Sequence, residues 1–440
     1  MKAKRAARVT RPWQLVLLAL AGVGGSLVLL WCRDWQLTLN DYATEARHPL
    51  SALLHFRVWH FLVTAPPYGA SLELRAPFAA IASLADGGAQ LVYRFSALPC
   101  LLAAVGLAVW IAPQLRSAGR GWIAVLVTLA VCVASPVNYY ALSIGHPEEI
   151  LGGVLCVAAV VAALRGRAAL AGVLLGVAIA NKQWAVVAVG PVLVALPTGR
   201  RRALLWAGGT AVAFLGPIAY AAGSATGAAA RVSVSDGGAI FYTQQIWWFL
   251  GTPGHWLPSM AGQIQRGFRL EPSWLAGRSH LLIAWIGLPL SYIAARRRMP
   301  RENALLLLAM LLLLRCMLDP WDIVYYPIPF ILALLAWETT VKHRAPWCAV
   351  AASLATWAIF ELLPTHLSAN QQALSFIVPT VLALALIGVS LYRRQPSSDG
   401  LSSAAQSTTS SSFVNWLSRR APSPVSTARS SIRTPSTPGR

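Results

Sequence analysis

The stretch ALLLLAMLLLLRCMLDPWD, residues 304–322, joins an unbroken aliphatic run to one arginine and two aspartates. An apolar segment of about 20 residues is long enough to cross the hydrocarbon core of a membrane. Similar runs recur along nearly the whole chain of 440 residues, which is 56% hydrophobic and 12% charged and has a mean hydropathy of +0.57. The sequence therefore predicts an all-α, polytopic integral membrane protein.

The short basic loops between the apolar runs predict the topology. Lysine and arginine in short loops stay in the cytoplasm, whereas long loops are translocated regardless of charge. With both termini inside, this rule is met by twelve transmembrane or partly spanning helices, near residues 13–32, 91–112, 121–137, 149–164, 168–180, 184–197, 203–222, 280–295, 303–318, 323–340, 346–362 and 373–392. Of the fifteen acidic residues, only Glu302, Glu338 and Asp399 then lie inside, so acid–base chemistry is expected on the outer face.

The ends of the chain differ from its apolar body. We predict that residues 1–12 are a basic cytoplasmic leader, 13–392 the transmembrane domain and 393–440 a disordered cytoplasmic tail rich in serine, threonine and proline. A secretory signal is the competing interpretation of the first run, but no small-x-small cleavage site precedes Arg33. The net charge of +21 is explained by basic loops and tails that fix topology, so no nucleic-acid partner is expected.

Two long loops lie outside in this topology, at about residues 33–90 and 223–279. Stretches rich in Trp, Tyr and His within them, at 53–63 and 241–251, suit amphipathic helices lying in the membrane interface. Their aromatic side chains either anchor the loops at the interface or line a site for a lipid or a sugar.

Two apolar segments, at 168–180 and 184–196, are too short to cross the membrane singly, since each spans only about 20 Å as a helix. A single crossing built from both would place the arginines at 200–202 outside, against the charge rule. We therefore predict a short helical hairpin whose tip, residues 181–183, lies below the outer surface. A charge at that depth is tolerated where it lines a watery cavity or is buried in protein, so Lys182 is a candidate site residue.

Four polar clusters face the outer side in this topology. They are Asp34, Asp41 and Glu45 after the first run, the stretch Gly145-His146-Pro147-Glu148-Glu149, Lys182 at the hairpin tip, and Arg315 with Asp319 and Asp322. Ionisable groups at the edge of the hydrocarbon are usually paired or functional.

Each cluster also has a purely structural explanation. Arg315 can form an ion pair with Asp319 or Asp322. The two glutamates suit a helix N-terminus behind a proline, and His146 can be a plain loop residue. Because Pro320 disfavours helical backbone at Asp319, we expect the helix to end there and both aspartates to lie on a turn at a cavity rim.

The acidic first outer loop, GHPEEILGGVL (145–155), the hairpin GRAALAGVLLGVAIANKQWAVVAVGPVLVAL (166–196) and YYPIPFILALLAWE (325–338) together resemble the bacterial membrane glycosyltransferases of family 87, in the GT-C superfamily. The likeness covers roughly residues 10–392. It implies a GT-C-like fold in the bacterial plasma membrane and the polyprenyl-phosphate-mannose-dependent α-1,2-mannosyltransferase activity of actinobacterial cell envelopes. The expected substrates are a polyprenyl-phosphate sugar donor and a lipid or glycan acceptor, alongside membrane lipids.

The resemblance also implies roles for individual residues. Such enzymes use a carboxylate of the first outer loop as general base toward the acceptor hydroxyl, while cations hold the lipid phosphate. Asp41, in LNDYATEA (39–46), matches the base, and Asp34 is the alternative. The donor phosphate would be held by Lys182, Arg315 and His146, and substrate hydroxyls would be bound by Glu148, Glu149, Asp319 and Asp322.

Neither a metal nor another cofactor is expected. The six cysteines lie in or at the ends of apolar runs without Cys/His ligand spacing, and no Asp-x-Asp motif of nucleotide-sugar enzymes occurs. Two other functions stay open. A transporter or lipid flippase would usually show internal repeats and charges near mid-membrane, and the chain can also be a lipid-binding subunit without catalysis.

Overall fold

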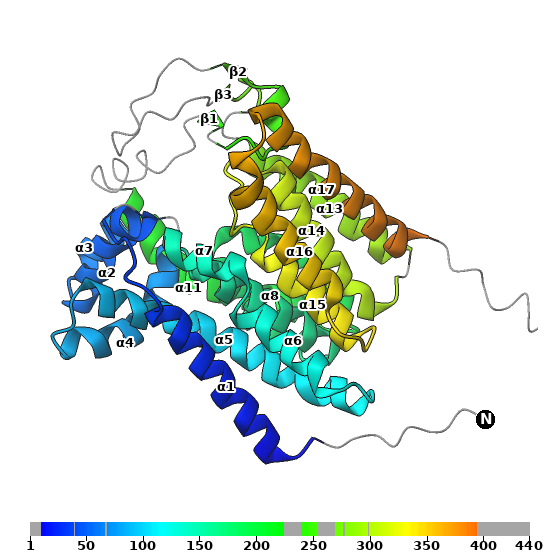
Figure 1. The fold of residues 1–440 in the computed structure, drawn as a ribbon, viewed down its shortest axis with the longest axis horizontal. Helices are drawn as coiled ribbons and strands as arrows, with labels where there is room; N and C mark the ends of the chain where they lie inside the picture. The colour runs from blue at the N-terminus through cyan, green and yellow to red at the C-terminus, as the bar shows by residue number, and fades with distance from the viewer. Residues whose placement is uncertain are drawn as a thin grey trace, which may run out of the picture. The chain divides into compact units, whose positions relative to one another are not determined.

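The computed structural model describes residues 10–38, 40–66, 68–223, 239–240, 242–253, 269–275, 278–297 and 299–393. Residues 1–392 form one compact unit, and its described part is almost entirely helical (Figure 1). The predicted cytoplasmic leader, 1–12, and disordered tail, 393–440, lie outside the described residues except for 10–12 and 393.

The first half of the unit consists of helices alone. They are α1 (Pro12–Trp31), the π-helical η1 (Tyr42–Ala46), α2 (Arg47–Leu54), α3 (Val58–Thr64), α4 (Gly69–Leu84), α5 (Ala89–Ser117), α6 (Trp122–Val133), α7 (Pro136–Ile144), α8 (Glu148–Leu164), α9 (Ala168–Asn181), the 3₁₀ segment η2 (Gln183–Ala188), α10 (Val189–Ala195) and α11 (Arg200–Ala222).

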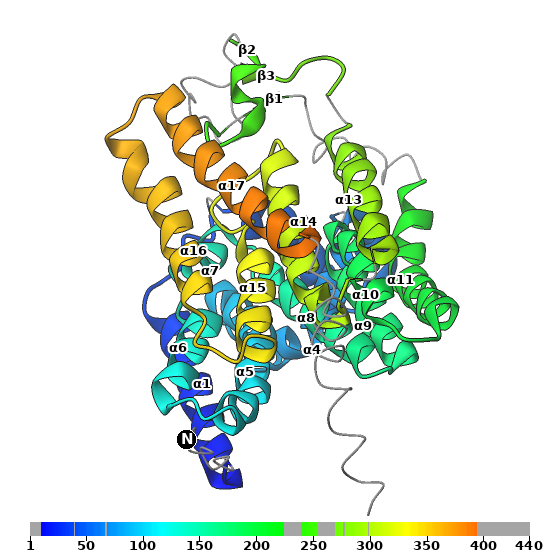
Figure 2. The ribbon, with the colours of Figure 1, turned by 90° about the vertical axis from the view of Figure 1, so that its right-hand side faces the viewer.

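The second half adds a small sheet at one end of the helices, close to the start of α17 in both views (Figures 1 and 2). Its elements are β1 (Ala239–Ile240), η3 (Ile246–Phe249), β2 (Thr252–Pro253), β3 (Arg269–Leu270), α13 (Ser279–Arg296), η4 (Arg301–Asn303), α14 (Ala304–Leu318), α15 (Ile328–Thr340), α16 (Trp347–Trp357), the π-helical η5 (Ala358–Leu362), η6 (Leu363–Thr365) and α17 (Ala369–Tyr392). The strand order is β1-β3-β2, and both pairs are antiparallel.

Within the described residues, six helices are long and apolar enough to cross a membrane. They are Pro12–Trp31, Ala89–Ser117, Trp122–Ile144, Arg200–Ala221, Trp347–Thr365 and Ala369–Tyr392. Four shorter apolar helices accompany them, at Ala168–Asn181, Gln183–Ala195, Leu281–Arg296 and Ile328–Thr340. The all-α character predicted from hydropathy is confirmed, while the twelve crossings and the GT-C arrangement stay predictions.

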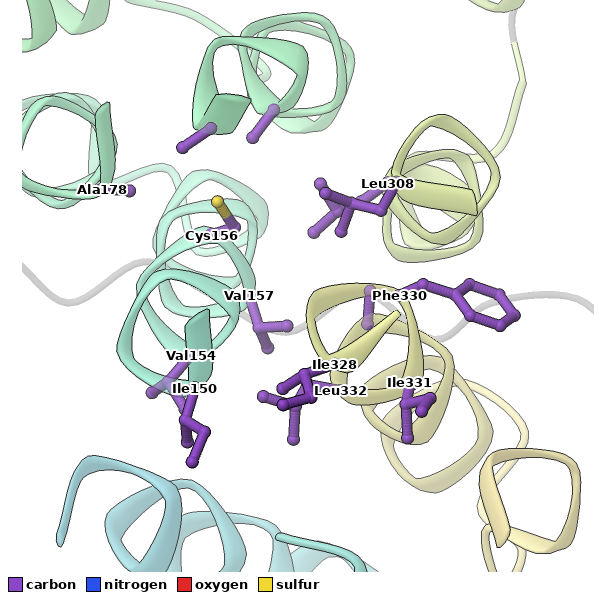
Figure 3. Packing of buried hydrophobic residues seen from close by; sticks show 14 of the residues in the cluster. Ile150, Val154, Cys156, Val157, Ala178, Leu308, Ile328, Phe330, Ile331 and Leu332 are labelled. Carbon is purple, nitrogen blue, oxygen red and sulfur yellow. The ribbon is translucent and has the colours of Figure 1, made fainter. Parts of the chain in front are cut away.

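Helix α8 lies at the centre of the core, where it contacts α5, α9, α10 and α15. Figure 3 shows Val157 of α8 and Ile328 and Leu332 of α15 pointing toward one another. The two helices approach closely because Gly153 has no side chain: a Cβ there would lie 2.9 Å from the Cα of Pro329. Small residues at such contacts let helix backbones pack tightly where lipid provides no hydrophobic drive. This packing fixes the start of α8, which carries two glutamates.

The stretch 53–63 is not one continuous helix, as the sequence suggested, but is divided between two helices. Helix α2 ends at Leu54 and α3 begins at Val58, with Phe56 between them at a φ of 57°. A large residue in left-handed backbone cannot continue an α-helix. The segment between α1 and α5 therefore folds as separate helices α2, α3 and α4.

The predicted helix at 241–251 is also wrong, because most of its described residues are not helical. Only η3 forms a short 3₁₀ turn, and the chain on either side pairs with β3. The guanidinium of Arg269 lies 4.4 Å from the ring centre of Trp248 and donates to the Trp248 carbonyl at 2.6 Å. The residues on either side of this stretch thus pair with β3, and a short 3₁₀ turn stands where a helix was expected.

Prolines account for two further differences from the predicted boundaries. The segment expected at 121–137 divides into α6 and α7 at Ser135, whose backbone is extended before Pro136, and the helix expected from 323 starts at Ile328, after Pro327. A proline disfavours helical backbone in the residue before it but suits the first turn of the next helix.

Candidate functional site

The hairpin tip lies against the start of α8. Helix α9 ends at Asn181, Lys182 has extended backbone and η2 begins at the next residue, which confirms the predicted break. The Asn181 side-chain amide donates to the Glu148 carbonyl at 2.9 Å. Because this bond holds the tip beside α8, the Lys182 ammonium is brought to both glutamates.

A glycine brings the segment after α1 to the same place. Gly145 has a φ of 109°, and a Cβ there would lie 2.5 Å from the Tyr42 nitrogen. Only glycine fits both the left-handed backbone and this close approach. The turn that carries Asp41 therefore rests directly on the residue before His146.

Glu148 is the centre of a buried charge network. Its side chain is fully buried and is contacted by the imidazole Nδ1 of His146 at 2.6 Å, by Arg75 Nη1 at 3.3 Å and by Lys182 Nζ at 3.4 Å. A buried carboxylate is stable only when such partners replace its lost hydration. Arg75, on α4, was not predicted as a site residue; the signal that points to it is an ionisable side chain within the apolar stretch of α4.

His146 connects this network to Asp41. Its Nε2 lies 3.0 Å from Asp41 Oδ2, and its ring lies 4.9 Å, centre to centre, from that of Tyr325. Burial and the nearby Lys182 ammonium lower the pKa of His146, but the two carboxylates that it contacts outweigh them and raise the pKa to about 9. At neutral pH both ring nitrogens therefore donate. The Asp41 side chain itself is 42% exposed.

Glu149 holds the second cation, Arg315. The Glu149 carboxylate lies 3.4 Å from Arg315 Nη1 and 3.6 Å from Lys182 Nζ, and it accepts a hydrogen bond from the Trp184 indole at 3.1 Å. The Arg315 guanidinium lies between two aromatic rings, 4.7 Å from that of Trp184 and 4.3 Å from that of Tyr326. Cation–π contacts of this kind fix the orientation of the guanidinium plane.

The two aspartates after α14 differ in their surroundings. The helix ends at Leu318 and Asp319 is extended, as expected from Pro320. Asp319 Oδ2 lies 3.9 Å from Arg315 Nε, so the expected ion pair forms beside the shorter contact with Glu149. Asp322 is fully buried instead of lying at the rim, and its carboxylate has no hydrogen-bond partner among the described residues. Burial and the neighbouring Asp319 raise the pKa of Asp322 well above its usual range.

Asp34, the alternative base, lies apart from the network. Its side chain is 86% exposed and pairs with Arg94 at 2.9 Å. In the described part of the chain, no ion pair joins Asp34 to His146 or Lys182.

The charged groups line a cavity of about 440 Å³. Its charged lining is Glu149, Lys182, Arg315 and Asp319, its aromatic lining is Tyr68, Trp184 and Tyr326, and Gln183 with apolar residues of η2 and α13 completes it. The Tyr68 ring lies 4.3 Å from Lys182 Nζ. The wall thus combines two cations, compensated by two carboxylates, with aromatic and aliphatic surface.

Most of the charged side chains at the site form ion pairs with one another. Within the described residues, no group of three or more His, Cys, Asp or Glu side chains is placed to hold a metal ion.

Comparisons with family models, with curated proteins and with solved structures give no match for this chain.

Proposed function

We propose that this chain is a membrane glycosyltransferase of the GT-C type, resembling family 87, that moves a hexose from a polyprenyl-phosphate donor to a lipid or glycan acceptor. The observation that carries the proposal is a continuous series of contacts. It runs from the half-exposed Asp41 through His146 and Glu148 to Lys182, which lines the cavity. A base at one end and a cation at the other are the two groups that glycosyl transfer from a phosphate needs.

The cavity suits the donor in both charge and shape. Lys182 and Arg315 offer N–H groups to a phosphate. The Tyr68, Trp184 and Tyr326 rings offer flat apolar surface to a sugar, and Val186, Val187 and Ile283 offer aliphatic surface to an isoprenoid chain. A volume of about 440 Å³ falls within the range of small-molecule sites.

The reaction is a single displacement. The acceptor hydroxyl gives its proton to Asp41 and its oxygen bonds to the anomeric carbon, while the bond from that carbon to the phosphate oxygen breaks. The bonding electron pair leaves with the lipid phosphate, whose added charge is stabilised by Lys182 and Arg315. Attack from the face opposite the leaving group inverts the anomeric centre.

His146 orients the base in this mechanism. Its Nε2–H holds Asp41 Oδ2 and its Nδ1–H is anchored on Glu148. The other Asp41 oxygen can then accept the hydroxyl proton. Positioned general bases typically contribute about 10²–10⁴-fold to a rate.

The proposal includes the setting inferred from the sequence: a bacterial plasma membrane, both termini cytoplasmic and the site on the outer face. It is supported by the apolar helices and by the basic residues of the predicted inner loops. The twelve crossings belong to the proposal too.

A transporter or lipid flippase is the second candidate, because buried charge networks such as Arg75–Glu148–Lys182 also serve ion and substrate pathways. Proteoliposomes with radiolabelled polyprenyl-phosphate mannose and an envelope lipid extract separate the two. Product carrying the label on a new lipid or glycan supports transfer. Movement of intact donor between leaflets without labelled product contradicts transfer and supports transport.

A further inference from the structure

A second cavity, of about 290 Å³, is lined by residues of α5, α8 and α9. Apolar side chains such as Trp110, Val157 and Leu174 form most of its wall, and two arginines, Arg165 and Arg167, complete it. No acidic residue is among the described residues that line it, and none of them also lines the cavity described above. An apolar wall that ends in uncompensated cations calls for a ligand with both an apolar part and a negative charge.

The second cavity lies far from the candidate site along α8. This helix begins at Glu148 and ends at Leu164, and its 17 residues rise about 25 Å. Arg165 is the residue that follows it. The arginines of the second cavity therefore lie at the opposite end of α8 from the network of Glu148.

The length of the second cavity matches one leaflet of a membrane. Val154 is its lining residue closest to the start of α8, and from there to Arg165 the helix rises about 16 Å. The hydrocarbon core of a bilayer is about 30 Å thick, so one leaflet contributes about half of that depth. A lipid with its charged head at Arg165 thus has apolar wall along the length of its acyl chain.

The wall of the second cavity has an open position at Gly106 of α5. This glycine is exposed, and a Cβ there would meet no atom within 4 Å. Trp110, one turn further along α5, has its ring centre 5.1 Å from the Arg165 guanidinium. Tryptophan is enriched where the hydrocarbon meets water, and a cation–π contact of this kind holds the guanidinium beside the apolar wall.

Three more arginines, at 200–202, lie at the same end as Arg165 and Arg167. Helices α9 and α11 are side by side (Figure 2). A Cβ on Gly199, which precedes α11, would lie 2.9 Å from the Cβ of Ala168, the first residue of α9. The first turns of the two helices therefore adjoin, and the exposed arginines of α11 follow directly.

The charges at this end have no local compensation. Residues 150–235 contain no Asp or Glu. Arg167 and the arginines at 200–202 lie at the starts of α9 and α11, and neither helix has an acidic residue in its first turn or a side-chain cap. Because the start of a helix carries positive partial charge, cations there are disfavoured unless an anion joins them. Phosphate oxygens are strong acceptors for guanidinium groups.

We propose that the second cavity binds an acyl chain of an anionic phospholipid whose phosphate is held by Arg165, Arg167 and the arginines at 200–202. Membranes supply such lipids, and basic pockets between helices on the cytoplasmic side suit their head groups. Arginines that only fix topology would need no apolar cavity beside them. The lipid stabilises the junction of α8, α9 and α11, since a ligand that binds only the folded state stabilises it. The site is independent of the proposed glycosyl transfer.

The test is photolabelling of the full-length protein in phosphatidylcholine nanodiscs. The probe is a minor fraction of phosphatidylglycerol with a diazirine on one acyl chain. Mass spectrometry locates the cross-links, which we expect at 103–110 and 154–162, enriched about fivefold over those on the apolar helix α17. A phosphatidylcholine probe with the same diazirine chain should show no such enrichment.

Two sets of variants separate the cavity from the charges. Gly106→Phe fills the open position and keeps every arginine, so it should abolish the enrichment. Its matched control is Gly388→Phe on α17, where a Cβ would also meet no atom within 4 Å, and it should label as the wild type does. Arg165→Gln/Arg167→Gln should lower the enrichment, and Arg165→Lys/Arg167→Lys should retain most of it because the charge is kept.

Equal enrichment with both probes would overturn the inference, because the charge of the head group would then play no part. Enrichment that survives Gly106→Phe would overturn it as well, since the arginines would then attract lipid without the cavity. The comparison of the two probes uses the wild-type protein and does not depend on how well any variant folds. Labelling needs no catalysis, so this result and that of the sugar-transfer assay are independent.

Discussion

The Nε2 of His146 lies 3.0 Å from Oδ2 of Asp41, while the Nδ1 of the same ring lies 2.6 Å from Oε1 of Glu148. One imidazole thus bridges a half-exposed carboxylate and a fully buried one. This arrangement requires a protonated ring, because both nitrogens must donate.

The bridge predicts a specific pH dependence of stability. The pKa of His146 rises from an ordinary 6.5 to about 9 in the folded protein. The contribution of the protonated ring to the free energy of unfolding is therefore fully present below pH 6.5 and is lost as the pH rises through 9. The free energy of unfolding should fall by about 3 kcal/mol over this range. Thermal unfolding of the purified protein between pH 6 and 10 measures it. His146→Gln should remove most of this decline, and an equal decline in the variant would contradict the assignment.

Arg75, on α4, should be structurally essential. Arg75→Met leaves the fully buried Glu148 with fewer cationic partners, so the free energy of unfolding should fall by about 3–5 kcal/mol. Thermal unfolding of the variant and the wild type measures this difference. The double variant Arg75→Met/Glu148→Gln should recover part of the loss because it removes the uncompensated charge. Strictly additive effects of the two substitutions would show that they are not coupled.

Arg315 should act through its planar guanidinium as well as its charge. Arg315→Lys keeps the charge but loses the fit between Trp184 and Tyr326, so we expect the KM for the polyprenyl-phosphate donor to rise about tenfold. Steady-state transfer assays measure the change. The matched control is Arg301→Lys, on the exposed η4, and it should behave as the wild type does. An unchanged donor KM in Arg315→Lys would remove Arg315 from donor binding.

Two native cysteines test the topology. Cys32, after α1, and Cys348, at the start of α16, are exposed, whereas the other four are buried. The predicted topology puts Cys32 outside and Cys348 inside. A membrane-impermeant maleimide should label the Cys348→Ala variant in intact cells, because its exposed cysteine is Cys32. The Cys32→Ala variant, whose exposed cysteine is Cys348, should be labelled only after permeabilisation. The opposite pattern would invert the topology.

Much of the site was predictable because each signal was local. The helix end at Asp319 follows from Pro320, and the break at Lys182 follows from two apolar runs that are too short to span. The expectation that His146, Glu148 and Lys182 face one side agrees with their contacts in the structure.

Other features depend on partners that sequence spacing cannot reveal. Arg75 contacts Glu148 through the packing of distant segments, and the strands on either side of 241–251, β1 and β2, pair with β3. The second cavity joins Trp110, Val157 and Leu174, which lie on three different helices. Neither hydropathy nor charge periodicity reports such contacts.

The measurement that tests the central claim most directly is sugar transfer by Asp41→Asn in proteoliposomes, beside wild type and Asp86→Asn. Asp86 is an exposed loop aspartate with a φ of 50°, which asparagine tolerates, so its variant is a matched control. We predict that transfer from polyprenyl-phosphate mannose falls about 10²–10⁴-fold in Asp41→Asn and is unchanged in Asp86→Asn. Transfer by Asp41→Asn at the wild-type rate would contradict the assignment of Asp41 as the base.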